Sequence, residues 1–133
     1  MGAWGADAFD NDTACDWVVE LEESSDLSVV ADALECVIEL EDDYLESDVA
    51  CEALAACEVI ARLKGHPGKS DAYTEGVDQW VKAHPIDPPA KLVAKALAAI
   101  DRIVDTDSEL AELWEDDTAW KSSIESLRTR LAT

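Results

Sequence analysis

The chain has 133 residues, of which 48% are hydrophobic and 31% are charged, a composition typical of one soluble globular domain. Its 31 acidic residues against 10 lysines and arginines give a formal charge of −21. So large a negative charge argues against binding to DNA, RNA or an anionic membrane, because such binding needs clustered cations.

The charge is concentrated in the first half of the sequence. Residues 1–61 contain 18 acidic side chains and no lysine or arginine, since the first basic residue is Arg62. The rest of the chain contains 13 acidic residues and all 10 bases, so the two parts carry −18 and −3. The field of so polarised a surface would speed the encounter with a positively charged protein.

The sequence shows no membrane-spanning segment and no signal for the secretory pathway. No stretch approaches the roughly 20 apolar residues that span a bilayer, and the N-terminus lacks the positive charge and the apolar run of a signal peptide. We therefore expect a cytoplasmic protein. The four cysteines form no C-x-x-C motif and are expected to be free, as small apolar residues.

Apolar residues recur at helical spacing and nowhere alternate as in a strand, which predicts an all-α fold. The first helix is expected to begin near residues 10–12, which offer N-caps, and to end near Glu22. The second helix is predicted over 27–41. The third, over 47–64, is rich in small residues that let neighbouring helices approach closely, so we place it at the centre of the bundle, with Gly65 at its C-cap.

Three further helices are predicted after the loop that follows Gly65. The first covers 74–83, and the second covers 89–104 with proline in its first turn. The last continues from Ser108 to Leu131, and Asp117 interrupts its heptad-like apolar spacing, which marks a kink or an exposed stretch. The prediction is thus one domain over 1–133, a compact bundle of five or six helices.

Each of these three helices has an expected set of inward-facing or outward-facing side chains. The inward set of the helix over 74–83 is Tyr73, Val77, Trp80 and Val81. The outward bases of the helix over 89–104 are Lys91, Lys95 and Arg102. The apolar stripe of the last helix is Leu110, Leu113, Trp120, Ile124, Leu127 and Leu131.

Several segments together resemble a known family. They are Met1-Gly2-Ala3-Trp4-Gly5, Phe9-Asp10-Asn11-Asp12 with Ala14 and Asp16-Trp17, the run from Glu52 to Ala61 leading to Gly65 and Pro67, and Ser108-Glu109-Leu110 through Leu113-Trp114-Glu115. In this order they resemble the bacterial domain of unknown function family four-two-five-nine. The resemblance implies a small bacterial helical protein, and it brings with it no activity and no catalytic residues.

Motifs that would carry chemistry are incomplete. Gly68-Lys69-Ser70 resembles the end of a phosphate-binding P-loop, but Leu63 stands where the first glycine is required and a helix precedes the segment instead of a strand. His66 and His84 each precede a proline and lack the partners of a zinc site or a general base. We therefore expect no cofactor. Trp4, Trp17, Trp80 and Trp114 are expected to face the core, while Trp120, near Asp117, is a candidate for an exposed patch.

Carboxylates are the abundant functional groups among the side chains of this sequence. Residues 10–12 with Asp16, and residues 41–46, could gather a hard cation such as calcium or magnesium, although neither segment matches an EF-hand loop. N-cap formation and solvation explain residues 10–12 as well. An enzyme or metal-binding protein that uses clustered carboxylates and a divalent cation therefore remains the alternative function.

The favoured function is an acidic, non-catalytic protein-interaction module that binds a basic protein through its N-terminal half. The more specific form of this hypothesis is an immunity-like protein. Its polyanionic face would block the cationic surface of a partner such as a toxin nuclease. The residues expected to form this face are Asp12, Asp16, Glu20, Asp32, Glu35, Glu39 and Asp43. Solubility, or adaptation to high salt, is the competing explanation of the charge, and the oligomeric state stays open.

Overall fold

The computed structural model describes residues 8–40, 43–68 and 70–133, and its described residues form seven α-helices. The all-α prediction is confirmed, and no described residue belongs to a named strand. The helices are α1 (Asp12–Glu22), α2 (Ser28–Ile38), α3 (Ser47–Leu63), α4 (Glu75–Ala83), α5 (Ala90–Ile103), α6 (Glu109–Leu113) and α7 (Thr118–Ala132). None of these helices is both long enough and apolar enough to cross a bilayer.

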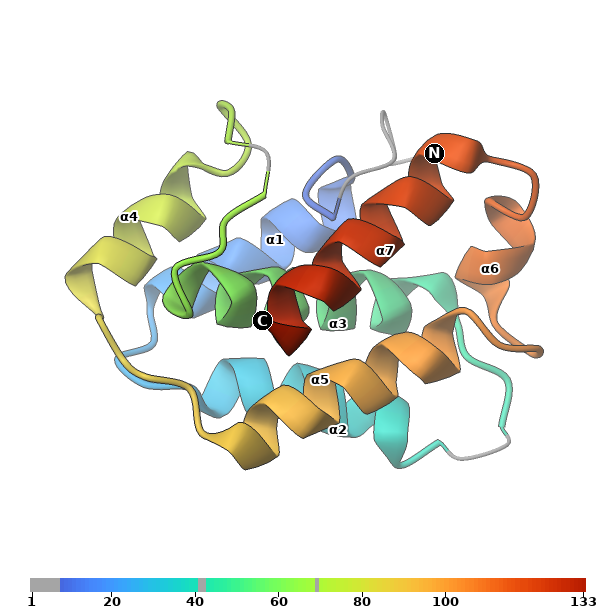
Figure 1. Cartoon of the computed structure of the whole chain (residues 1–133), viewed down its shortest axis with the longest axis horizontal. Coiled ribbons are helices and arrows are strands. Elements are labelled where there is room, and N and C mark those ends of the chain that lie inside the picture. Colours follow the sequence, from blue (N-terminus) through green and yellow to red (C-terminus); the bar gives the residue numbers. More distant parts are fainter. Residues whose placement is uncertain (1–7, 41–42, 69) are drawn as a thin grey trace.

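Helix α3 packs against each of the other six helices. In Figure 1 it lies in the middle of the view, with α1 and α4 above it, α2 and α5 below it and α7 crossing in front. Five of its alanines are completely buried, because a small side chain lets a neighbouring backbone come close. The buried apolar side chains of all seven helices form one hydrophobic cluster.

Local capping residues set several helix ends where the sequence predicts them. Asn11 accepts a hydrogen bond from the Ala14 N–H at 2.8 Å and so begins α1. Gly65 follows α3 with φ +85°, a left-handed conformation that suits glycine. The His66 N–H then donates to the Ala61 carbonyl at 2.9 Å, the bond that closes a Schellman motif.

The prediction of one long last helix is wrong. Asp117 accepts a hydrogen bond from the Trp120 N–H at 2.9 Å and is the N-cap of α7, so the chain forms two helices where the heptad spacing predicted one. This break brings the number of helices in the described residues to seven instead of five or six. It also turns Leu113, expected in the apolar stripe, toward solvent with 57% of its surface exposed.

The large aromatic residues follow the predictions only in part. Trp17 and Trp80 are buried as expected, and Trp120, the candidate for an exposed patch, is also buried. Trp114 is half-buried against the core. Tyr73 was predicted to face inward and is 50% exposed, because it precedes α4 in a turn instead of lying on the helix. Trp4 lies outside the described residues.

Candidate functional site

The predicted acidic residues of α1 lie together on its outer side. Asp12, Asp16 and Glu20 are all exposed. They follow one another at intervals of four residues, and the buried face of the helix lies opposite them. Within the described part of the chain, no lysine or arginine forms an ion pair with any of the three.

Helix α3 adds two carboxylates to this surface. Burial raises the pKa of Glu52, and the charges of Glu20 on α1 and Asp48 on α3 raise it further. Repulsion of this kind requires the carboxylates of the two helices to lie near one another. We call Asp12, Asp16, Glu20, Asp48 and Glu52 the α1–α3 acidic face.

One of the predicted acidic residues of α2 pairs with a base of α5. The Glu35 carboxylate forms an ion pair with Lys95, and both side chains are about one-third exposed. Beyond the end of α2, the Asp43 carbonyl accepts a hydrogen bond from Arg102 at 2.6 Å. Asp32 and Glu39 are exposed on the outer side of α2. The seven predicted residues thus lie on two parts of the molecule. Three are on α1, beside α3, and four are on α2 or just after it, where α5 packs.

The residues predicted for the polyanionic face did not include Asp48 and Glu52, because α3 was placed at the centre of the bundle. The signal was present in its amphipathic pattern. The two residues are four positions apart, on the turns of α3 where side chains remain half-buried or exposed. What the sequence does not show is that α1 lies next to this side of α3.

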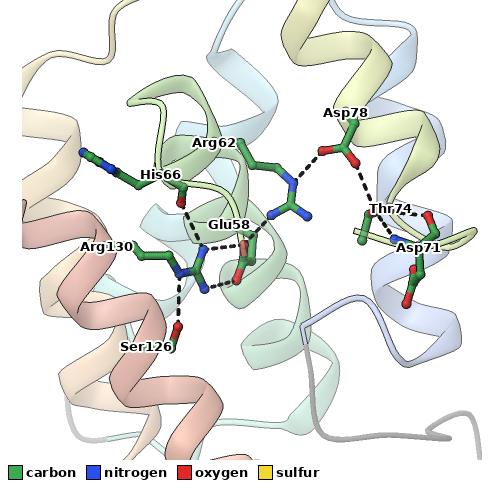
Figure 2. Close-up of polar contacts among 8 residues, drawn as sticks. All are labelled: Glu58, Arg62, His66, Asp71, Thr74, Asp78, Ser126 and Arg130. Atoms are coloured by element: carbon green, nitrogen blue, oxygen red, sulfur yellow. Dashed lines mark hydrogen bonds and ion pairs between the residues drawn. The ribbon is translucent and has the colours of Figure 1, made fainter. Parts of the chain in front are cut away.

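A second polar cluster is buried between helices, and sequence reasoning missed it as well. Glu58 of α3 accepts hydrogen bonds from Arg62 at 2.7 Å and from both terminal nitrogens of Arg130 on α7, at 3.0 and 2.6 Å. Arg62 also donates to Asp78 of α4 at 2.8 Å, and Asp78 accepts from Thr74 at 3.0 Å. Figure 2 shows how these side chains converge from α3, α4 and α7.

The burial of the cluster makes it part of the framework that positions the helices. The side chains of Arg62 and Glu58 are only 2% and 9% exposed. Bidentate contact with a carboxylate is the strongest pairing that a guanidinium makes, and Glu58 receives it from Arg130. We call Glu58, Arg62, Asp78 and Arg130 the buried ion cluster; it connects α3 to α4 and α7.

A pocket of about 330 Å³ lies beside the buried ion cluster. Phe9 forms part of its wall, and the Arg62 guanidinium lies 5.7 Å from the centre of the Phe9 ring, a cation–π contact. Ser122, Ser123 and Ser126 of α7 supply hydroxyl groups on another side. Of its charged residues, Glu58 binds both Arg62 and Arg130, so these three serve the packing of the helices. Asp10 also lines the pocket and is buried.

The cysteines and histidines do not form a reactive site in the structure. All four cysteines are free. Burial raises the pKa values of Cys15 and Cys57, and it raises that of Cys51 to about 11, which keeps these thiols protonated and weakly nucleophilic at neutral pH. His84 stacks on Trp80 with ring centres 4.6 Å apart. Among the described residues, no three His, Cys, Asp or Glu side chains are arranged to hold a metal ion.

Comparison with known proteins gives a family and no activity. No match is found among curated proteins or among solved structures. A family model described as Domain of unknown function (DUF4259) matches residues 2–123, nearly the whole chain, and it is the family that the sequence motifs resemble. The chain therefore belongs to the DUF4259 family.

Proposed function

We propose that the protein is a non-catalytic acidic interaction module that binds a basic partner protein, with the α1–α3 acidic face as its contact surface. The observation that carries the proposal is the state of Asp12, Asp16 and Glu20. These carboxylates are exposed, and none forms an ion pair with a base of the described chain. Unpaired, exposed carboxylates keep the potential that steers a positive protein toward the surface.

The distribution of the bases supports the same surface. Arg62 and Arg130 belong to the buried ion cluster, Lys95 and Arg128 bind acidic residues of other helices, and Lys64 donates to the Leu131 carbonyl. None of these contacts neutralises α1. The proposed contact surface keeps Asp12, Asp16 and Glu20 of the seven predicted residues and leaves out those of α2 and its C-terminal end, where Glu35 is paired with Lys95 on α5.

An immunity-like role is the sharper form of the proposal, in which the α1–α3 acidic face covers the cationic surface of a toxin nuclease. We place this role in the bacterial cytoplasm. The family resemblance supports a bacterial origin, and four free cysteines agree with a reducing compartment. The bundle around α3 then serves as the rigid support of the surface.

A pair of variants with equal charge tests the proposal. Asp12→Asn/Asp16→Asn/Glu20→Gln removes three charges from the acidic face, and Glu75→Gln/Asp87→Asn/Asp116→Asn removes three exposed charges elsewhere. The immobilised proteins are compared for capture of proteins from bacterial lysate, quantified by mass spectrometry at 0.05 and 0.5 M salt. We expect the wild type and the second variant to retain a basic protein at low salt only, and the first variant to lose it.

Equal loss of that protein from both variants would show that net charge alone retains it and would refute the surface. Capture of no basic protein by the wild type would refute the proposal as a whole. Calorimetric titration with calcium, magnesium and manganese tests the alternative function. A tight stoichiometric site would favour carboxylate and metal chemistry over the interaction module.

A further inference from the structure

A hollow of about 740 Å³ is lined by residues that follow the end of α5 and by residues of α6, the turn after it and α7. Its apolar lining comes from Val104, Ala111, Trp120 and Ile124. Trp120 and Ile124 belong to the core, with 6% and 5% of their surfaces exposed, so the core itself fixes the positions of these two side chains. Pockets for small organic ligands have this size range, roughly 300–1,000 Å³, and this mostly apolar character.

The break before α7 accounts for the hollow. Helix α6 ends at Leu113, and α7 begins only after Asp117, so the two helices do not continue one another. A single continuous helix through this region, as the heptad spacing predicts, would place the lining residues of α6 and α7 along one helix axis. The turn between the helices instead leaves a hollow that Trp120 helps to line.

The charged groups around the hollow favour a cation. Four carboxylates and two bases line it, which gives a formal charge of −2. One of the bases, Arg128, forms an ion pair with Asp101, and its Nε lies 3.6 Å from a Glu125 oxygen. The other charged residues of the lining are three carboxylates, those of Asp105, Glu112 and Glu115, and one base, Lys121. A ligand with a carboxylate or phosphate group would be repelled here.

Glu112 is held in place at the edge of the hollow. Its Oε2 accepts a hydrogen bond from the Tyr44 hydroxyl at 2.8 Å, across 68 residues of sequence. This hydrogen bond raises the pKa of Tyr44 to about 12, so the hydroxyl remains a donor at neutral pH. One oxygen of the carboxylate is thus fixed, and the group as a whole is oriented before any ligand arrives.

We propose that this hollow binds a small hydrophobic amine, whose apolar body contacts Trp120 and Ile124 and whose ammonium group lies near Glu112 and Glu115. The site is separate from the α1–α3 acidic face and does not depend on the function proposed for it. The ligand class is a primary alkylamine or arylalkylamine, because it combines an apolar body with one compact cation.

Three probes of equal skeleton test the ligand class. 4-Phenylbutylamine, 4-phenylbutanol and 4-phenylbutyrate are titrated into the ¹⁵N-labelled protein, and the indole N–H resonance of Trp120 is followed by NMR. We expect saturable binding of one amine per chain, about tenfold tighter than binding of the carboxylate and tighter than binding of the alcohol. Equal affinities for the three probes, or no saturable shift of Trp120, would overturn the proposal.

Two double variants of equal charge separate a site from general attraction to an acidic protein. Glu112→Gln/Glu115→Gln is expected to weaken amine binding about fivefold and to leave the alcohol unaffected. Asp12→Asn/Glu20→Gln, on the α1–α3 acidic face, is expected to leave both affinities unchanged. If both variants weaken the amine equally, the amine only condenses on the negative surface and the proposed site is wrong. Circular dichroism confirms that each variant is folded.

Discussion

Replacing Glu58 by glutamine removes the charge on which the buried ion cluster depends. Glutamine has nearly the same shape, so the helix packing is kept while the carboxylate that binds Arg62 and Arg130 is lost. The Arg62 side chain is 2% exposed and cannot turn to solvent. It also forms an ion pair at 2.8 Å with Asp78, whose side chain is 38% exposed.

The expected loss of stability is large for a single polar substitution. Removing one partner of a buried ion pair costs about 3–5 kcal/mol, because the other charge stays buried without compensation. Since Arg62 keeps its contact with Asp78, we expect the lower end of this range, about 3 kcal/mol. A domain of this size has a total stability of about 5–15 kcal/mol, and the loss corresponds to a fall in Tm of roughly 10 °C.

Urea denaturation followed by circular dichroism measures this loss, with two variants for comparison. Glu35→Gln breaks the pair with Lys95, whose two side chains are about one-third exposed, and is expected to cost about 0–1 kcal/mol. Glu58→Leu/Arg62→Met/Arg130→Met replaces the three least exposed members of the cluster by apolar side chains and is expected to recover most of the stability. A Glu58→Gln loss no greater than that of Glu35→Gln, or a triple variant as unstable as the single one, would refute the reasoning.

Three further predictions concern a helix cap, a carboxylate and the thiols. Asp117→Ala removes the N-cap of α7 and is expected to lower the free energy of unfolding by about 1 kcal/mol, while Asp116→Ala, beside it and exposed, leaves it nearly unchanged in urea denaturation. The folded-state pKa of Glu52 is raised above its ordinary value of 4.5, so its ionisation destabilises the fold as pH rises through that raised value. Glu52→Gln should therefore stabilise the protein at pH 7 and have no such effect well below pH 4.5. A gain in stability that persists at low pH would contradict the electrostatic cause. The exposed thiol of Cys36 is expected to react with Ellman's reagent in the native protein, and that of buried Cys57 only after denaturation, as Cys36→Ser and Cys57→Ser variants will show.

Helices with a local stop or start signal could be predicted closely from the sequence. The N-cap at Asn11 and the left-handed glycine at Gly65 act within a few residues of the helix ends that they set. The break at Asp117 was seen only as an irregularity, because two local signals compete there. The apolar spacing favours one continuous helix, whereas the aspartate side chain favours a new N-terminus.

Features that need a distant partner could not be predicted. The spacing of Glu58 and Arg62, four residues apart, is visible in the sequence, but Arg130 lies 72 residues from Glu58. In the same way, the outer face of α1 could be predicted from its helical period. That Glu52 belongs to the α1–α3 acidic face depends instead on how α1 packs on α3. Helical periodicity shows which side of a helix faces outward and not which neighbour lies beside it.

The contact between Arg130 and Glu58 also bears on how the protein matures. Helix α7 is synthesised after all the other described helices, so Glu58 can pair with Arg62 early but gains its contact with Arg130 only once α7 docks. The interior around α3 can become dry only when α7 has left the ribosome and docked. A nascent chain stalled before residue 130 lacks the guanidinium that binds Glu58, so this part of α3 would stay open to chaperones and proteases until α7 emerges and docks.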